Sequence, residues 1–157
     1  MNVDGQAAIV TGGASGLGAA TARMLAEKGA KVAIFDLNED HGNSIAKETG
    51  GIFSACDVSE ESSVQNGLDA AKEAHGAARI LVNCAGIGYA ARVVGRNGPH
   101  DYELFSKVIS VNLMGTFNVT RLFAVEATQL EPLEDNERGV VIMTASVATF
   151  DGQIGQA

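Results

Sequence analysis

Short apolar runs alternate with longer segments of helical period along most of this sequence, and this alternation restricts the fold more than any other feature. The runs are AAIVT (7–11), KVAIF (31–35), GIFSA (51–55), RILVN (79–83) and GVVIMT (139–144). Strands that are apolar on both faces are typical of parallel sheets covered by helices. The sequence therefore predicts an α/β fold with a doubly wound parallel sheet of the Rossmann type and right-handed crossovers.

The segments between these runs have the spacing of amphipathic helices. We expect one helix between the first two strands, one over 59–75, and one of about 25 residues or more that begins at Asp101 after a loop over 87–100. The residues expected on their apolar faces are Leu17, Met24, Leu25 and Lys28 in the first helix, Val64, Leu68 and Ala71 in the next, and Phe105, Val108 and Ile109 in the last. No internal repeat or domain boundary is visible, so residues 1–157 are expected to form one domain.

Charge and composition exclude several classes of partner. The chain has 11 Lys and Arg against 19 Asp and Glu, a net charge of −8, which disfavours binding to nucleic acid or to anionic membrane surfaces. No apolar run approaches the ~20 residues that span a bilayer, and the first strand follows Met1 too closely for a signal peptide. We therefore expect a cytoplasmic protein, or one that reaches an organelle by a signal not seen in this sequence. The two cysteines lack metal-ligand spacing and the three histidines are scattered, so buried reduced thiols and no metal site are expected.

A glycine-rich segment, TGGASGLG (11–18), follows the first strand directly. Gly12 permits a tight turn, Gly16 allows backbone N–H groups to approach a pyrophosphate, and Gly18 allows close packing of the next helix. Glycines also serve plain turns, so this segment alone is weak support for a phosphate site. Asp36, at the end of the second strand, strengthens it, because a carboxylate there can accept both ribose hydroxyls of an adenosine.

Polar and small residues also follow the third and fourth strands, as CDVS (56–59) and NCAG (83–86). Both segments fall on the carboxyl edge of the sheet, where such folds bind ligands. Asp57 either contacts a cofactor or caps the helix expected to begin near Ser59, and its position leaves both readings open. Asn83 is a cofactor contact or an ordinary turn residue. The small residues Ala85 and Gly86 leave room for a flat ring against the backbone.

Taken in order, these motifs resemble the short-chain dehydrogenase/reductase family across the whole chain. NCAGI, VNLMGTFNV (111–119) and TASVATFDGQIGQA (144–157) are most similar to its type II 3-hydroxyacyl-CoA dehydrogenases, which share Cys84 in place of the commoner asparagine. The resemblance implies NAD as the cofactor, a small-molecule substrate, and a homodimer or homotetramer in the complete protein. The residues it implies for cofactor binding are Gly12, Ser15, Gly16, Leu17, Gly18, Asp36, Asp57, Val58, Asn83, Cys84, Ala85 and Gly86.

Two further residues have possible catalytic roles. Asn112 interrupts the apolar stripe of its helix and must find hydrogen bonds inside; it is either a satisfied core asparagine or, by resemblance, the residue whose main chain holds a water in a proton relay. Ser146 is either a helix cap or, by resemblance, the serine that hydrogen-bonds the substrate oxygen. The resemblance also places Gln153 near the substrate, although a polar loop residue would look the same.

The family's catalytic Tyr-x-x-x-Lys motif falls beyond Ala157. Tyr89 and Tyr102 lie in the wrong segment, and neither has a lysine four residues later. Because no base is present to take the alcohol proton, the 157 residues alone are expected to be inactive. The resemblance implies a polypeptide of roughly 250 residues, the usual family length, in which residues 1–157 are a dinucleotide-binding Rossmann domain that is incomplete after its fifth strand. The alternative is a non-catalytic nucleotide-binding or interaction protein derived from the same fold.

Overall fold

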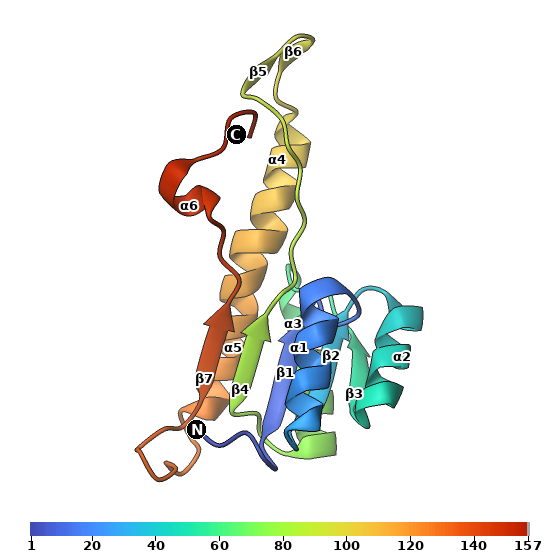
Figure 1. Ribbon diagram of the computed structural model, residues 1–157, viewed down its shortest axis with the longest axis vertical. Helices are drawn as coiled ribbons and strands as arrows, with labels where there is room; N and C mark the ends of the chain where they lie inside the picture. Colours follow the sequence, from blue (N-terminus) through green and yellow to red (C-terminus); the bar gives the residue numbers. More distant parts are fainter. Residues whose placement is uncertain (157) are drawn as a thin grey trace.

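The computed structural model describes residues 1–156, and its centre is a parallel sheet of five strands in the order β3-β2-β1-β4-β7 (Figure 1). The strands are β1 (Ala7–Thr11), β2 (Lys31–Asp36), β3 (Ile52–Ala55), β4 (Ile80–Asn83) and β7 (Val140–Met143). Each lies within the apolar run predicted for it or ends one residue beyond that run. Strand order reverses on either side of β1, which is the doubly wound arrangement, so the predicted fold class is confirmed.

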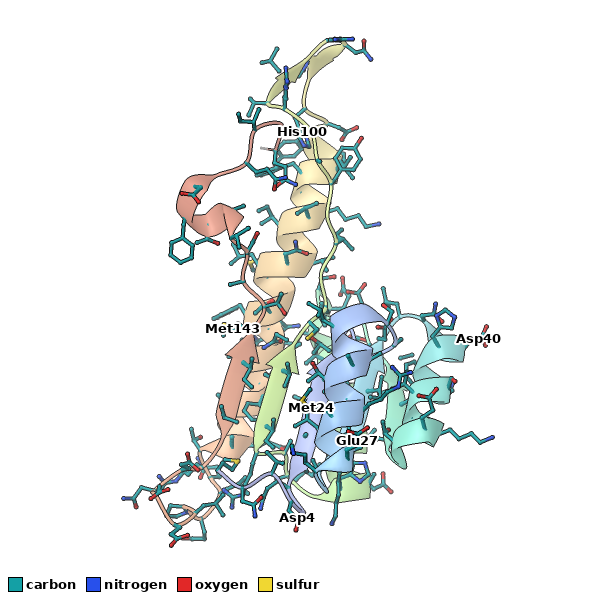
Figure 2. All side chains as sticks on the ribbon, viewed as in Figure 1. Asp4, Met24, Glu27, Asp40, His100 and Met143 are labelled. Carbon is teal, nitrogen blue, oxygen red and sulfur yellow. The ribbon has the colours of Figure 1, made fainter. Side chains whose placement is uncertain are left out.

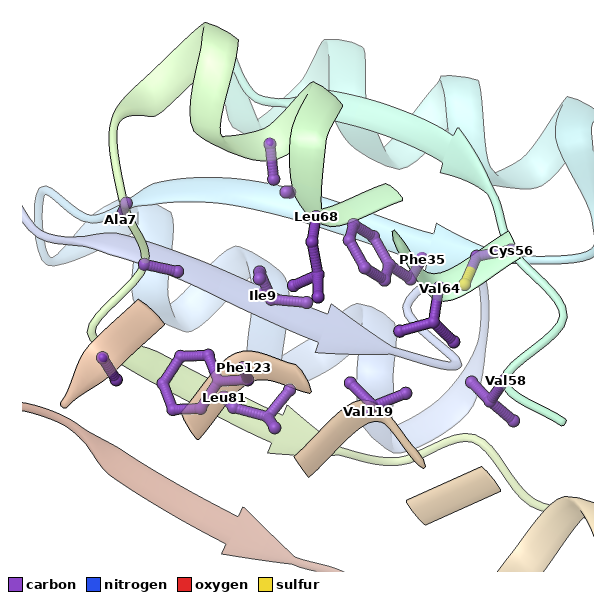
Figure 3. Close-up of a cluster of buried hydrophobic side chains, with 14 residues drawn as sticks. Ala7, Ile9, Phe35, Cys56, Val58, Val64, Leu68, Leu81, Val119 and Phe123 are labelled. Carbon is purple, nitrogen blue, oxygen red and sulfur yellow. The ribbon is translucent and has the colours of Figure 1, made fainter. Parts of the chain in front are cut away.

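Two layers of helices cover the sheet and bury two apolar cores. On one face, α1 (Gly16–Glu27) and α2 (Glu39–Thr49) pack over alternate side chains of the central strands. On the other face, α3 (Glu61–His75) and α5 (Thr116–Ala127) enclose the cluster that includes Phe35, Val64, Leu68 and Phe123 (Figure 3). Every residue of β1 and β4 is buried. Apolar side chains on both faces of these strands allow this burial between two layers of helices.

The buried face of α1 differs from the one predicted. Met24, labelled in Figure 2, is 61% exposed and Leu17 is 72% exposed, whereas Gly18, Ala19 and Ala22 are buried. The prediction followed the largest apolar residues, but the fully buried side of α1 carries only small residues, and of the predicted face Leu25 alone packs against this core. In α3 the predicted face is correct, because Val64, Leu68 and Ala71 are all buried.

One continuous helix runs from Tyr102 to Ala127 and extends well beyond the carboxyl edge of the sheet (Figure 1). It consists of α4 (Tyr102–Ile109), a π-helical segment η1 (Ser110–Gly115), and α5. Asp101 caps its first turn by accepting a hydrogen bond from the Leu104 N–H at 3.0 Å. The predicted start and length are correct, but the π-helical segment was not predicted.

The same helix is the one segment of residues 1–156 that is long and apolar enough on average to span a bilayer, although polar residues such as Asn112 and Arg121 interrupt its apolar runs. Its mean hydropathy is 1.3 over an 18-residue window of which 22% is buried, although core helices of soluble proteins pass the same test of length and composition. Much of the apolar character lies on sides that residues 1–156 leave open. The exposed apolar residues there include Leu113, Met114, Phe117 and Val125.

Three further elements complete the described chain. The predicted loop over 87–100 contains a short antiparallel hairpin, β5 (Val94–Gly95) with β6 (Gly98–Pro99), at the far end of the long helix (Figure 1). The strand β7 pairs with β4 and is an edge strand among residues 1–156, with Ile142 and Met143 more than half exposed. A short helix, α6 (Ala148–Asp151), follows β7.

Candidate functional site

A groove of about 580 Å³ lies at the carboxyl edge of the sheet, where the loops after β1, β2, β3 and β4 meet. Eleven of the twelve predicted cofactor-binding residues line it, and the exception is Asn83. The groove is also lined by residues that were not predicted: Phe35, Leu37, Cys56, Ser59, Ile87, Lys107 and Val111. The sequence motifs, which are far apart along the chain, therefore converge on one site.

The glycine segment brings two loops into contact at the floor of this groove. Gly12 has a φ of 65°, and a Cβ there would lie 2.7 Å from the Ala85 backbone nitrogen. A Cβ at Gly18 would collide with the Gly12 carbonyl oxygen. Gly16 is different, because its φ of 49° favours glycine while the space beside it is open. Glycine at positions 12 and 18 thus keeps the first turn of α1 tight against the β4 loop.

The amino terminus of α1 opens into the groove without a side-chain cap. Ser15 occupies the N-cap position, but its side chain accepts no capping hydrogen bond, and the first turn contains no acidic residue. The other helix on this face, α2, has both, since Asn38 accepts from the His41 N–H and two acidic residues follow it. The first N–H groups of a helix have no partner within the helix and attract anions. Those of α1 are therefore positioned to bind one.

Asp36 is held rigidly at the end of β2. Its Oδ2 accepts a hydrogen bond from the Ala14 N–H at 3.0 Å, and its Oδ1 accepts from the Asn38 N–H at 2.9 Å. Each carboxylate oxygen can accept a second hydrogen bond, so the group still has capacity for ligand hydroxyls. Asp36 lines the groove together with Leu37.

The segment after β3 forms a side wall of the groove. Asp57 Oδ1 accepts from both the N–H and the hydroxyl of Ser59, at 2.9 and 2.6 Å. The helix begins two residues later than expected, at Glu61, so Asp57 closes a local turn and does not cap the helix. Val58 is buried, and it packs so closely against Gly115 that a Cβ at Gly115 would collide with the Val58 side chain.

The loop after β4 is tied to β1 through Thr11. The Thr11 hydroxyl accepts from the backbone N–H groups of Cys84 and Ala85, at 3.2 and 3.1 Å. Asn83 lies beneath the groove: it is 3% exposed, and its carbonyl oxygen accepts from the Thr144 N–H and hydroxyl. Its position joins β4 to the end of β7 and does not line the groove.

The two thiols in the groove differ in their surroundings. Burial raises the pKa of the Cys56 thiol to about 11, so this residue is protonated at neutral pH. Cys84 is half-buried, and both cysteines are free thiols. Among residues 1–156, no group of three or more His, Cys, Asp or Glu side chains is arranged to hold a metal ion.

Asn112 lies in the π-helical segment and clamps the loop after β4. Its Oδ1 accepts from the Ile87 N–H and its Nδ2 donates to the Ile87 carbonyl, both at 2.8 Å. Its own carbonyl oxygen accepts from the Thr116 hydroxyl at 2.8 Å. Of the two alternatives for Asn112, the core asparagine is excluded because the residue is exposed, and the catalytic role stays a prediction. The side chain finds its hydrogen bonds on a neighbouring loop because the helix passes beside that loop outside the core.

Ser146 and Gln153 lie in the segment that follows β7. The Ser146 hydroxyl accepts from the Ala148 N–H at 3.2 Å and is exposed. This hydrogen bond lies just ahead of α6, at the end of β7, the strand paired with β4. Gln153 is also exposed and lies just after α6. Neither residue lines the groove.

An uncapped helix end, a fixed carboxylate after β2 and small residues after β4 all lie at the carboxyl edge of this doubly wound sheet, which is the arrangement typical of dinucleotide-binding folds. The family model for short chain dehydrogenases matches residues 6–157, and the chain belongs to that family. The resemblance seen in the sequence motifs is thus confirmed.

Three of the similar proteins have the same name. The chain is 47% identical to the human 3-hydroxyacyl-CoA dehydrogenase type-2, over 99% of this chain and 61% of that protein. It is 48% identical to the Drosophila melanogaster protein of the same name, over 95% of this chain and 60% of that protein. The crystal structure of 3-hydroxyacyl-CoA dehydrogenase type-2 from Mycobacterium avium matches with a TM-score of 0.91 and 42% identity, over 99% of this chain and 63% of that one. The chain therefore spans about three fifths of the length of these relatives.

Proposed function

We propose that this chain is the cofactor-binding part of an oxidoreductase that transfers a hydride between NAD(H) and a secondary alcohol or ketone. The observation that carries the proposal is the uncapped first turn of α1 inside a groove that also contains a fixed carboxylate. The first feature suits the diphosphate of a dinucleotide, and the second suits the hydroxyls of its adenosine ribose. When bound, the nicotinamide ring supplies the hydride chemistry.

The groove fits NAD better than NADP. Asp36 would face the additional 2′-phosphate of NADP with a like charge, and neither Ser15 nor Leu37, which lie beside it, carries a positive charge to offset this. The described groups that donate hydrogen bonds to the Asp36 carboxylate are the backbone N–H groups of Ala14 and Asn38, which carry no net charge. We therefore propose NAD(H) as the cofactor.

The proposed substrate class is a 3-hydroxyacyl-CoA thioester. Support comes from the names of the human and Drosophila relatives and from their identity of nearly one half. In this reading, Ser146 donates a hydrogen bond to the substrate oxygen and Gln153 lies near the substrate. Both residues follow β7, the strand next to β4, whose loop Asn112 holds in place.

The proton step needs a base that residues 1–157 do not contain in the family's position. We propose that the tyrosine and lysine of the Tyr-x-x-x-Lys motif belong to another part of the polypeptide, and that the complete protein is a homodimer or homotetramer. Residues 1–157 alone are then inactive, because loss of a general base typically lowers the rate by 10²–10⁴.

The test measures acetoacetyl-CoA reduction with NADH by the full-length polypeptide that contains this sequence, with residues 1–157 alone as the comparison. NADH oxidation by the full-length protein and none by residues 1–157 is the expected result. Activity of the full-length protein toward sugars or simple alcohols only would contradict the substrate proposal. NADH oxidation by residues 1–157 alone would contradict the assignment of the base.

A further inference from the structure

The groove contains one side chain with a positive charge. Of the residues that line it, Lys107 alone is basic. It lies in the last turn of α4, four residues before Val111, which also lines the groove. Residues four apart share one face of a helix, so Lys107 and Val111 belong to one wall. Through α5 the long helix packs on the face of the sheet opposite α1, so Lys107 and the glycine loop line the groove from different elements.

The charge balance of the groove makes this lysine significant. Asp36 and Asp57 also line the groove, and both would repel the diphosphate of a dinucleotide. The amino terminus of α1 offers a partial positive charge equivalent to roughly half an elementary charge, which is smaller than the charge of either carboxylate. A full positive charge on another wall would offset this repulsion and make the groove more attractive to a dianionic group.

Lys107 is also available for a ligand. Its side chain is exposed and forms no ion pair with any residue in the described range 1–156. By contrast, Arg23, Lys72 and Arg121 are each paired with a glutamate. Glu103 lies one turn before Lys107 on the same helix, and the two form no ion pair. The ammonium group thus has no protein partner that a ligand must displace.

We propose that Lys107 binds the diphosphate of the dinucleotide from the wall that it forms with Val111. The proposal rests on the proposed function and adds a cofactor-binding residue that the sequence motifs do not include. An ammonium group on a flexible four-carbon stem suits this role, since it acts as a point charge and can follow a phosphate in a wide groove. The helix end contributes directed N–H groups, and Lys107 contributes the net charge.

The test uses two ligands that differ in their charge. In the full-length protein, the dissociation constants of ADP-ribose and adenosine are measured by calorimetry for the parent, Lys107→Met, Lys107→Arg and Lys47→Met. Lys47 is a matched control, because it is exposed on α2 and does not line the groove. Lys107→Met is expected to weaken ADP-ribose binding about tenfold and to leave adenosine within about twofold. Lys107→Arg should restore ADP-ribose binding, and Lys107→Met should also show a weaker dependence of ADP-ribose binding on salt.

Three results would overturn the assignment. They are unchanged binding of ADP-ribose by Lys107→Met, an equal loss for adenosine, and an equal loss in Lys47→Met, which would indicate a general effect of net charge. If the parent binds neither ADP-ribose nor NADH, both this inference and the proposed cofactor are wrong. If the parent binds them and Lys107→Met does so equally well, only the role of Lys107 is wrong.

Discussion

Replacement of Asp36 by asparagine tests the cofactor preference most directly. The carboxylate is fixed by the Ala14 and Asn38 N–H groups, so it cannot turn away from a 2′-phosphate in the groove. Two like unit charges about 4 Å apart repel by about 4 kcal/mol at an effective dielectric of 20. Screening by salt and partial exposure reduce this to about 2–3 kcal/mol. The parent is therefore expected to bind NADH about 30- to 150-fold more tightly than NADPH.

Asp36→Asn removes the charge and keeps the shape of the side chain. The ratio of the two dissociation constants is expected to fall to within about fivefold, mainly because NADPH binding improves. One of the two backbone N–H groups would then face the amide Nδ2 and lose its acceptor, which costs about 1–3 kcal/mol of stability. Titration of both cofactors into the full-length protein, followed by nucleotide fluorescence, measures the ratio, and thermal unfolding measures the stability.

Asp69→Asn provides the matched control. Asp69 is exposed on α3, lies outside the groove, and loses the same unit of charge on substitution. It should leave the cofactor ratio unchanged. The reasoning is refuted if the parent binds NADPH as tightly as NADH, or if Asp36→Asn and Asp69→Asn have the same ratio.

Three further predictions concern the walls of the groove. Gly18→Ala should destabilise the fold by about 3 kcal/mol or more in urea unfolding, because its Cβ would collide with the Gly12 carbonyl oxygen, whereas Gly16→Ala should cost about 1–2 kcal/mol, from its positive φ alone, because the space there is open; equal costs would contradict this. Asn112→Ala should lose about 1–3 kcal/mol and speed amide exchange in the loop after β4, and unchanged exchange would count against the clamp. With a pKa of about 11, Cys56 has about one thiolate per thousand at pH 8, so iodoacetamide should modify Cys84 first in the folded protein, and bound NADH should slow that reaction; faster modification of Cys56 would contradict the burial argument.

The sequence by itself determined the order of strands and helices and most of the groove. Apolar runs on both faces identify buried parallel strands, and every such run became a strand. Because the carboxyl ends of parallel strands lie at one edge of the sheet, the motifs after β1, β2, β3 and β4 must all lie at that edge. Gly12 and Asp36 could therefore be assigned to one site although they are far apart in the chain.

The tertiary structure alone decided which faces of the helices are buried and which residues outside the motifs reach the groove. Periodicity shows that α1 is amphipathic, but its packing against the sheet selects Ala19 and Ala22 over Leu17 as the buried residues. The π-helical segment shifts the phase of the long helix where Asn112 meets the loop after β4, and no local pattern encodes that meeting. Lys107 resembles any other surface lysine in sequence. Its place in the groove depends on the packing of the long helix against the opposite face of the sheet from α1, an arrangement set by contacts between residues distant in the chain.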